Sequence, residues 1–258
     1  MQNNTFSGLF VGQNIISLKT IDSTNNYLRD ELSKSAPLPE GTVIMAEAQT
    51  AGRGQLTNTW HSEPGKNLTF SLLLRPGFIN PADQFILNKC ISVALNEVLQ
   101  RILGNKAAIK WPNDIYFGSG KLGGMLIENI IRGSQWKYAI IGIGLNVNQE
   151  AFPDSLRNAT SIAKILQSNY DLTILLSEIC SHIEGWYLRL KSGHREEISR
   201  RYREKLYRLN EPHRYRVMKT GEEFTGTITN VTDEGILQLD HEGAQKDYSL
   251  KEIEFLNV

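Results

Sequence analysis

Residues 110–128 contain the side chains whose types and spacing best suit chemistry. A Trp-Pro step is followed by Asn113 and Asp114, and a lysine, Lys121, stands shortly before a Gly-Gly step. Pro112 fixes its own φ and biases the preceding tryptophan toward extended geometry, so the polar pair leaves the turn in a defined direction. Carboxylate and amide oxygens suit Mg²⁺ or ribose hydroxyls, and a lysine places a compact cation beside a phosphate. The run therefore indicates a site that handles a nucleotide phosphate.

A second informative segment is the loop that contains Gly52-Arg53-Gly54. A glycine on each side of Arg53 lets the backbone approach a ligand closely while one cation is presented, which favours an anion. Taken alone, the segment is better explained as a flexible loop than as a site. It is neither a Walker A loop, because no GxxxxGK[ST] occurs, nor a dinucleotide fingerprint in its usual context.

Hydrophobic periodicity predicts the elements that position these loops. Strands are expected at 14–20, 42–48 and 67–74 from their β-branched and apolar residues, and at 123–131 and 136–147 from nearly continuous apolar runs that suggest burial on both faces. Helices are expected after Ser23, at 80–103, at 172–190 and from Arg195 through Leu209. Short alternating strands with turn residues between them follow, at 214–219, 223–231, 236–240, 246–250 and 253–256. Their spacing is typical of a small barrel, so a domain boundary is placed at residue 210.

Composition excludes several functional classes. The 258 residues include 28 basic and 28 acidic side chains, so the net charge of zero gives no reason to expect a polyanionic partner. Cys90 and Cys180 are alone and far apart in sequence, which argues against a disulfide framework or a structural zinc site. Neither a signal peptide nor an apolar stretch long enough for a bilayer is visible, so a cytoplasmic protein is expected. The basic stretch 200–216 contains interspersed acidic residues, which favours a solvated face or a domain interface over a nucleic-acid site.

Together, the loops resemble those of the biotin protein ligases. The matching motifs, in the family's order, are Ser-Thr-Asn at 23–25, Gln49 with Gly-Arg-Gly at 52–54, Lys-Trp-Pro-Asn-Asp at 110–114, the lysine and glycine step at 121–124, Gly-x-Gly-x-Asn at 142–146 and Ala-Thr-Ser at 159–161. They cover nearly the whole chain, and several spaced motifs in register are far more specific than any one of them.

The resemblance implies an α+β fold. Residues 1–209 would form a class II aminoacyl-tRNA synthetase-like catalytic domain with a mixed sheet and flanking helices, and residues 210–258 an SH3-like β-barrel. Because only residues 1–13 precede the first expected strand, a monofunctional ligase without the N-terminal DNA-binding domain is expected. Neither DNA nor a membrane is an expected partner, and the sequence leaves a homodimer open.

The resemblance also implies a reaction in two steps. Biotin and ATP with Mg²⁺ give biotinyl-5'-adenylate and pyrophosphate, and a lysine of a biotin carboxyl carrier protein then takes the biotinyl group. No tightly bound prosthetic group is expected. The first step sets a carboxylate against a phosphate, so fixed positive charge must offset the charge of the transition state. Arg53 and Lys121 are the implied catalytic residues.

The family's binding residues are carried over position by position. Biotin is expected to contact Ser23, Thr24, Asn25, Gln49, Gly52, Arg53, Gly124, Leu126 and Gly142, and ATP to contact Arg53, Gln55, Trp60, Lys110, Asn113, Asp114, Lys121 and Asn146, with Asp114 as the Mg²⁺ ligand. A neutral ureido ring on an apolar thiolane needs a few polar contacts within an apolar wall. Taken singly, Ser23-Thr24 is also readable as a helix cap, Trp60 as packing, and Leu126 and Gly142 as core strand residues.

One departure from the family concerns the residues after Gly54. Many members continue with a further arginine and a basic run, whereas this chain has Gln55-Leu56-Thr57-Asn58. We expect biotinyl-adenylate to be held less tightly than in arginine-bearing relatives, because fewer charge-assisted hydrogen bonds are available. Slow release of the adenylate without acceptor, unchanged by Gln55→Arg, would contradict this.

Two alternatives come from the same residues. A lipoate or octanoate ligase shares the fold and the chemistry, but it should carry an Arg-Arg-x-x-Gly-Gly-Gly loop and lack Lys-Trp-Pro-Asn-Asp, and this chain shows the opposite. A nucleic-acid-binding module built on the C-terminal barrel and the basic stretch would bind random DNA or RNA with a steep salt dependence.

Overall fold

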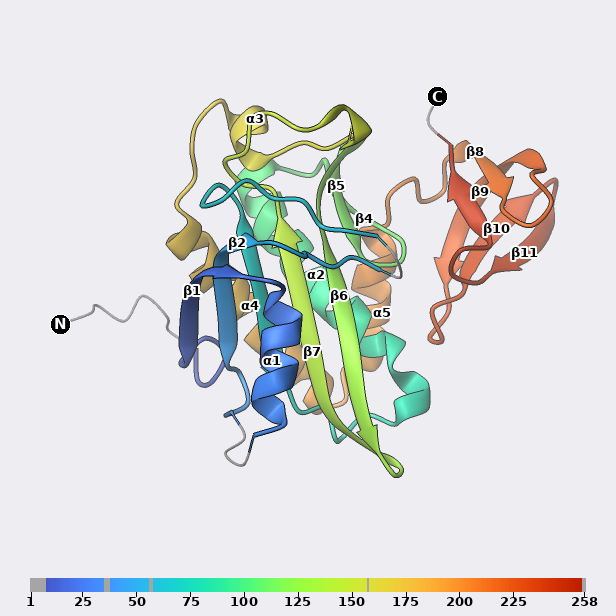
Figure 1. The fold of residues 1–258 in the computed structure, drawn as a ribbon. Coiled ribbons are helices and arrows are strands. Elements are labelled where there is room, and N and C mark those ends of the chain that lie inside the picture. The colour runs from blue at the N-terminus through green and yellow to red at the C-terminus, as the bar shows by residue number, and fades with distance from the viewer. Residues whose placement is uncertain (1–7, 35–37, 56–57, 157, 257–258) are drawn as a thin grey trace.

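In the computed structural model, which describes residues 8–34, 38–55, 58–156 and 158–256, the larger domain is built on a seven-stranded mixed sheet (Figure 1). Its order is β1-β2-β3-β7-β6-β5-β4, with β1 and β2 parallel and every other pair antiparallel. The strands are β1 Ile15–Ile21, β2 Val43–Gln49, β3 Leu68–Leu74, β4 Ala107–Lys110, β5 Asp114–Phe117, β6 Gly120–Arg132 and β7 Gln135–Leu145.

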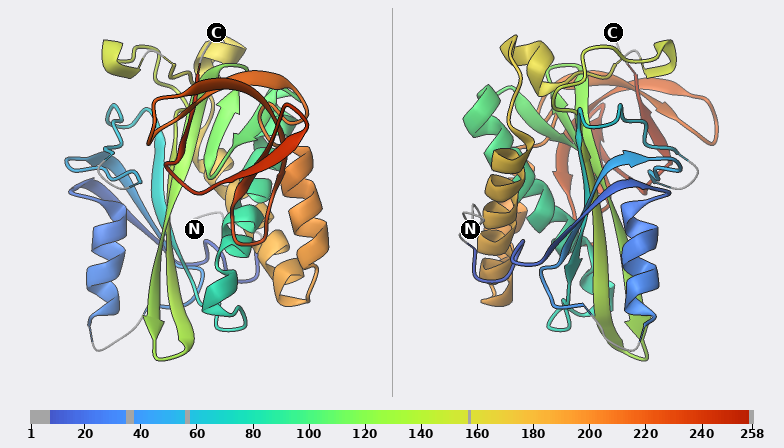
Figure 2. Two further views of the ribbon diagram at one scale, coloured as in Figure 1. Left: turned by 90° about the vertical axis from the view of Figure 1, so that its right-hand side faces the viewer. Right: turned by 60° about the vertical axis from the view of Figure 1, so that its left-hand side comes forward.

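Helices cover both faces of this sheet (Figures 1 and 2). Helix α1, Thr24–Leu32, lies on one face, and α2 Phe85–Leu103, α4 Leu172–Lys191 and α5 Arg195–Glu204 lie on the other; the shorter helices are η1 Pro81–Asp83, η2 Asp154–Leu156 and α3 Ile162–Leu166. Strand β3 is buried throughout: Leu72 packs in the core on the α2 side, and Leu73 packs with Leu28 of α1. Burial on both faces explains why its sequence is almost continuously apolar.

A five-stranded antiparallel sheet follows, in the order β11-β10-β9-β8-β12. Its strands are β8 Pro212–Val217, β9 Glu223–Val231, β10 Leu237–His241, β11 Ala244–Tyr248 and β12 Ile253–Phe255. Several contacts join it to the larger domain, among them one at α2 and one at the turn between β4 and β5. The ammonium of Lys89 on α2 lies 2.7 Å from Asp233 Oδ1, and the indole N–H of Trp111 donates to the Gly235 carbonyl at 2.9 Å.

The expected α+β architecture, a mixed catalytic sheet with helices and a small C-terminal β domain, is confirmed. Strands β4 and β5 were not predicted, because four residues are too few for periodicity to distinguish a strand from a loop. The expected helix at 80–103 is divided into η1 and α2, and Asn80 caps η1 by accepting from the Ala82 N–H at 3.0 Å. The proposed boundary at residue 210 falls between α5 and β8.

The prediction that the third long helix continues through Leu209 is wrong, because α5 ends at Glu204. Beyond that residue the backbone pairs with β4 instead. The Ile109 N–H donates to the Lys205 carbonyl at 2.8 Å, and the Tyr207 N–H donates to the Ile109 carbonyl at 2.8 Å. Backbone groups bonded to the edge of a sheet are no longer available for i→i−4 helical bonds.

Candidate active site

A pocket opens where α1 begins, beside the 50–60 loop and one end of β3, β6 and β7. It is lined by Ser23, Thr24, Asn25, Gln49, Arg53, Gly54, Gln55, Asn58, Thr59, Trp60, Thr69, Phe70, Asp114, Lys121, Gly124, Met125, Leu126, Gly142, Ile143 and Gly144. Two of the sequence motifs meet here because Gly124 of β6 pairs with Gly144 of β7 in the antiparallel ladder. The lining is therefore drawn from five segments that are far apart in sequence.

Polar groups at the start of α1 form one wall of the pocket. The backbone N–H and the hydroxyl of Thr24 both donate to Gln49 Oε1, at 2.8 and 3.1 Å. Ser23 occupies the N-cap position and is 2% exposed, but its side chain makes no cap hydrogen bond. Helix capping therefore does not account for the serine at this position, and Ser23 lines the pocket together with Thr24 and Gln49.

Asn25 fills the space above Gly142. Its Oδ1 accepts from the Ser71 hydroxyl at 2.5 Å, and its Nδ2 donates to Glu128 Oε2 at 2.8 Å. A Cβ at Gly142 would stand 2.4 Å from Asn25 Oδ1, which no real side chain tolerates. The glycine is thus required by the close approach of Asn25.

Two further glycines have equally specific neighbours. A Cβ at Gly124 would lie 2.6 Å from Asp114 Oδ1, and one at Gly144 would lie 2.4 Å from Cε2 of Trp60. The Trp60 ring therefore rests directly against the backbone of β7. Its Nε1 is buried and has no hydrogen-bond partner among the described residues, so a donor remains available beside the pocket.

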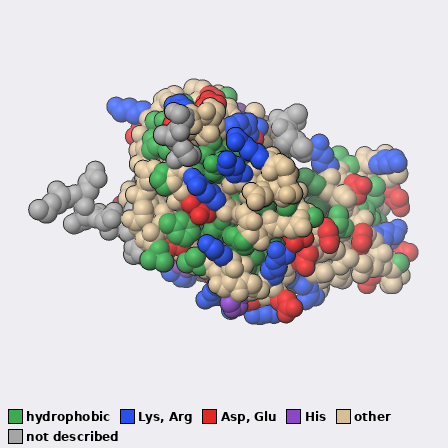
Figure 3. All heavy atoms as spheres, turned by 90° about the horizontal axis from the view of Figure 1, so that it is seen from below, with side chains coloured by type: hydrophobic (Ala, Val, Ile, Leu, Met, Phe, Trp, Pro, Cys, Tyr) green, Lys and Arg blue, Asp and Glu red, His purple; other side chains and the backbone are tan. Residues whose placement is uncertain are grey.

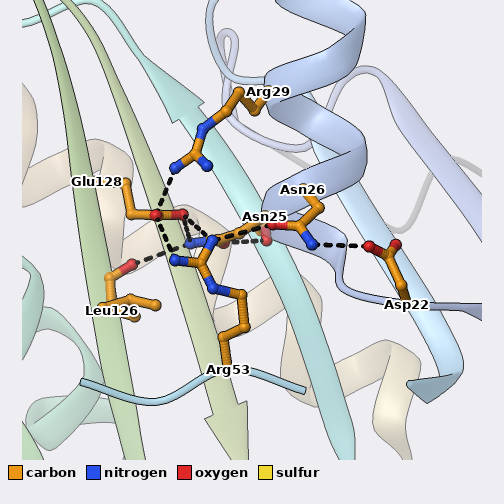
Figure 4. Close-up of polar contacts among 8 residues, drawn as sticks. Asp22, Asn25, Asn26, Arg29, Arg53, Leu126 and Glu128 are labelled. Atoms are coloured by element: carbon orange, nitrogen blue, oxygen red, sulfur yellow. Dashed lines mark hydrogen bonds and ion pairs between the residues drawn. The ribbon is translucent and has the colours of Figure 1, made fainter. Parts of the chain in front are cut away.

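The two predicted catalytic cations, Arg53 and Lys121, line this same pocket. Lys121 Nζ lies 2.7 Å from Asp114 Oδ2. The Arg53 guanidinium faces Glu128 with both terminal nitrogens, Nη2 to Oε1 at 3.1 Å and Nη1 to Oε2 at 3.3 Å, and Nη1 also donates to Asn26 Oδ1 at 2.9 Å (Figure 4). Both cations are thus already held by acidic partners in the protein.

Sequence reasoning assigned no role to Glu128, Asn26 or Ser71, although all three bond to pocket residues. Glu128 is the last residue of the motif-bearing run 110–128. This position was the only feature of the sequence that could have indicated a role for Glu128. Because side chains alternate along a strand, Leu126 and Glu128 share one face of β6, the face on which α1 lies.

Lys110, a predicted ATP contact, does not line the pocket. Its ammonium bonds to Tyr116 Oη at 3.1 Å and lies 5.1 Å from the ring centre of Phe255 in the C-terminal domain. Burial lowers the pKa of Lys110, since desolvation penalises its charged form. Its contact with ATP stays a prediction.

Three other predicted residues also stand outside the lining. Asn113 Nδ2 donates to the Met125 carbonyl, and Asn146 Nδ2 donates to the Thr160 carbonyl at 3.1 Å. Gly52 accepts from the Trp60 N–H at 2.9 Å and so closes the base of the loop. Their ligand contacts stay predictions. Leu56 and Thr57, part of the unusual sequence after Gln55, lie outside the described residues.

Three arginines of the basic stretch near the domain junction, Arg200, Arg214 and Arg216, are paired with acidic residues. Within the described part of the chain, Arg200 lies 2.7 Å from Glu204, and Arg216 lies 2.6 Å from Glu223 and 2.8 Å from Glu254. Figure 3 shows Lys and Arg interspersed with Asp and Glu across one face of the molecule. These pairs favour the solvated-face interpretation over a nucleic-acid site.

The family follows from sequence and fold together. The profile described as the Biotin/lipoate A/B protein ligase family matches residues 17–146, which span the pocket-lining segments of the larger domain. The chain belongs to this family. The bifunctional ligase/repressor BirA of Bacillus subtilis is 32% identical over 244 residues, covering 93% of this chain and 73% of that protein.

Two further relatives support the family's biotin-ligase branch. The biotin–[acetyl-CoA-carboxylase] ligase of Mycobacterium tuberculosis is 26% identical over 225 residues, 84% of this chain and 80% of that protein. The biotin protein ligase from Aquifex aeolicus, solved in complex with biotin and ATP, superimposes with a TM-score of 0.78 at 27% identity, covering 95% of this chain and 100% of that one. In the part of this chain that the structure describes, no helix is long and apolar enough to cross a membrane.

Proposed function

We propose that this chain is a biotin protein ligase that condenses biotin with ATP in the pocket described above and then transfers the biotinyl group to a lysine of a biotin carboxyl carrier protein. The observation that carries the proposal is the joint presence of Arg53 and Lys121 in one pocket with the polar wall of Ser23, Thr24 and Gln49. Family membership and the relatives' activity support it.

In the first step a biotin carboxylate oxygen bonds to the α-phosphorus of ATP while the bond to the bridging oxygen breaks and pyrophosphate leaves. Negative charge accumulates on the phosphoryl oxygens. Fixed cations are effective there because they need no reorganisation during the reaction. We assign this role to Arg53 and Lys121. In the second step the acceptor amine attacks the acyl carbon, and AMP leaves with its phosphate oxygen.

Asp114 is the residue that we assign to Mg²⁺. No group of three or more His, Cys, Asp or Glu that could hold a metal occurs among the described residues. A single carboxylate fits the nucleotide-bound ion nonetheless, because Mg²⁺ commonly binds one or two carboxylates together with substrate phosphates and waters. Bound Mg²⁺ would neutralise phosphate charge. The 2.7 Å pair between Asp114 and Lys121 keeps both groups on the pocket before nucleotide binds.

The apolar part of the pocket suits the thiolane ring. Phe70, Met125, Leu126 and Ile143 supply apolar surface, while the glycines at 124 and 142 let Asp114 and Asn25 pack closely against the backbone. Thr24 uses both of its donors on Gln49 Oε1, which fixes the orientation of the Gln49 amide. A fixed amide, together with the Ser23 hydroxyl, offers the few polar contacts that a ureido ring needs.

The substrate is tested by pyrophosphate exchange into ATP with biotin, lipoate and octanoate offered separately. We expect exchange with biotin alone, and exchange with lipoate or octanoate alone would contradict the proposal in favour of the family's other branch. Lys121→Ala and Arg53→Ala should each lower biotin-dependent exchange by about 100-fold or more, the magnitude typical of losing one fixed transition-state donor. Lys137→Ala, an exposed lysine on β7, is the matched control and should be unchanged.

A further inference from the structure

Glu128 is the centre of a charge network beside the pocket. Its carboxylate bonds to the guanidiniums of Arg29 and Arg53 and to the amide of Asn25 (Figure 4). Arg29 comes from α1, Arg53 from the 50–60 loop, and Glu128 from β6. One side chain therefore ties the helix and the loop of the pocket to the sheet.

The contact between Glu128 and Arg53 has the fork-to-fork form, with each terminal nitrogen facing one carboxylate oxygen, at 3.1 and 3.3 Å. This form fixes the plane of a guanidinium as well as its position. The Glu128 side chain is only 15% exposed, against 39% for Arg53, so the more buried partner holds the more exposed one. Asn26 adds a third contact to Arg53 at 2.9 Å.

If one carboxylate were paired with Arg53 alone, it would cancel the positive charge that attracts the anionic group of a ligand. Arg29 removes this difficulty, because two guanidiniums share one carboxylate and a net positive charge remains. Asp22 stands close enough for the charge of Arg53 to contribute to lowering its pKa, but its principal partner is Asn26, whose hydrogen bond is the main cause of that lowering. Arg29 is not part of the pocket lining, so its charge acts through Glu128.

We propose that Glu128 is a positioning residue that holds Arg53 over the pocket, and that Arg29 offsets the charge of Glu128 so that Arg53 stays available to the carboxylate or phosphate of the ligand. This inference rests on the proposed function of the pocket. It assigns neither Glu128 nor Arg29 a contact with the substrate.

The test is a double-mutant cycle measured by biotin-dependent pyrophosphate exchange. Glu128→Gln should raise the KM for biotin about tenfold, the effect of losing about one charge-assisted hydrogen bond, with a smaller change in kcat. Arg29→Gln should raise the KM about threefold at low salt, and this effect should fade at high salt because Arg29 is exposed. The double variant should match Glu128→Gln alone, because Arg29 then has no carboxylate to offset.

The matched control is the pair Arg101–Glu178, a 3.1 Å ion pair remote from the pocket lining. Arg101→Gln and Glu178→Gln should leave the KM for biotin unchanged, and thermal melting of every variant separates a folding defect from a change in the site. An unchanged or lowered KM in Glu128→Gln would overturn the positioning role, and additive effects in the double variant would overturn the role of Arg29. If the wild-type protein shows no biotin-dependent exchange, the proposed function itself fails instead.

Discussion

At the scale of single residues, Gly142 shows how little free space surrounds the polar groups of the pocket. A methyl group there would meet the side-chain oxygen of Asn25 at 2.4 Å. Asn25 has little room to yield, because it is 2% exposed and bonds to Ser71 and Glu128. A change at Gly142 therefore disturbs Asn25 and, through Glu128, Arg53.

Gly142→Ala should raise the KM for biotin at least tenfold through this displacement, an effect of about 1.4 kcal/mol on binding. The backbone at Gly142 is not in the left-handed region, so the expected loss comes from the clash and not from strain. The measurement is biotin-dependent pyrophosphate exchange. Gly185→Ala is the control, since its Cβ meets nothing within 4 Å and helix α4 favours alanine there. Equal KM values in the two variants would contradict the account.

At the scale of elements, the turn between β4 and β5 is held from outside the sheet. The Tyr202 hydroxyl of α5 donates to the Pro112 carbonyl at 2.9 Å, and the Trp111 indole donates to Gly235 at 2.9 Å. Asp114, the first residue of β5, follows this turn and faces Lys121. Helix α5 and the C-terminal domain thus help to fix the direction in which Asp114 points.

Tyr202→Phe removes one of these two contacts without changing the packing volume appreciably. The Pro112 carbonyl loses a buried donor, so the free energy of unfolding should fall by about 1–2 kcal/mol and the KM for ATP should rise. Tyr215→Phe is the matched control, because the Tyr215 hydroxyl is buried with no partner among the described residues. Its loss should be neutral or stabilising. Urea unfolding of both variants measures the change in the free energy of unfolding. Equal destabilisation by the two substitutions would contradict the assigned role of the Tyr202 hydroxyl.

At the scale of the whole molecule, one buried lysine joins the two domains. Lys89 is 1% exposed, and its ammonium bonds to Asp233 at 2.7 Å, Ser199 at 3.2 Å and the Val231 carbonyl at 3.4 Å. A buried ammonium is costly unless it is paired, so its partners in the C-terminal domain must stay in place. The pair therefore favours the docked arrangement in which Trp111 reaches Gly235.

Asp233→Asn should lower the free energy of unfolding by about 1–2 kcal/mol, less than the ~3–5 kcal/mol of a fully buried pair, because the Asp233 side chain is 78% exposed. Combining it with Lys89→Met should recover most of the loss, since no unpaired charge is then buried. Denaturant unfolding of the single and double variants measures both effects. A double variant as unstable as Asp233→Asn would show that the charge is not the cause.

The same contact predicts a dependence of stability on pH. The hydrogen bond from Lys89 is the main cause that lowers the pKa of Asp233 below its ordinary value of 3.8. The folded protein therefore binds the proton less readily than the unfolded chain, and the contribution of Asp233 is complete above that value and is lost as pH falls through the folded pKa. Acid unfolding curves of wild type and Asp233→Asn should differ most above pH 3.8 and converge as the pH falls below the lowered pKa of folded Asp233. If the free energies of unfolding of the two proteins differed by the same amount at every pH, this prediction would be contradicted.

The sequence by itself determined the family and most of the elements. Motifs such as Lys-Trp-Pro-Asn-Asp and the glycines at 124 and 142 are recognisable without a structure because each combines residue types with a fixed local spacing. The periodicity of residues 172–190 likewise predicted α4, since an amphipathic stripe repeats along one chain segment. Local patterns of this kind depend only on neighbours in sequence.

Only the tertiary structure decided which side chains meet. Glu128 and Arg53 are 75 residues apart, and no local pattern pairs them; the strand order and the register of β6 bring them together. Lys110 and Asn113 belong to the motif but do not line the pocket, and they have other partners in the C-terminal domain and on β6. Strand alternation and packing across the sheet set these directions, and both depend on segments distant in sequence.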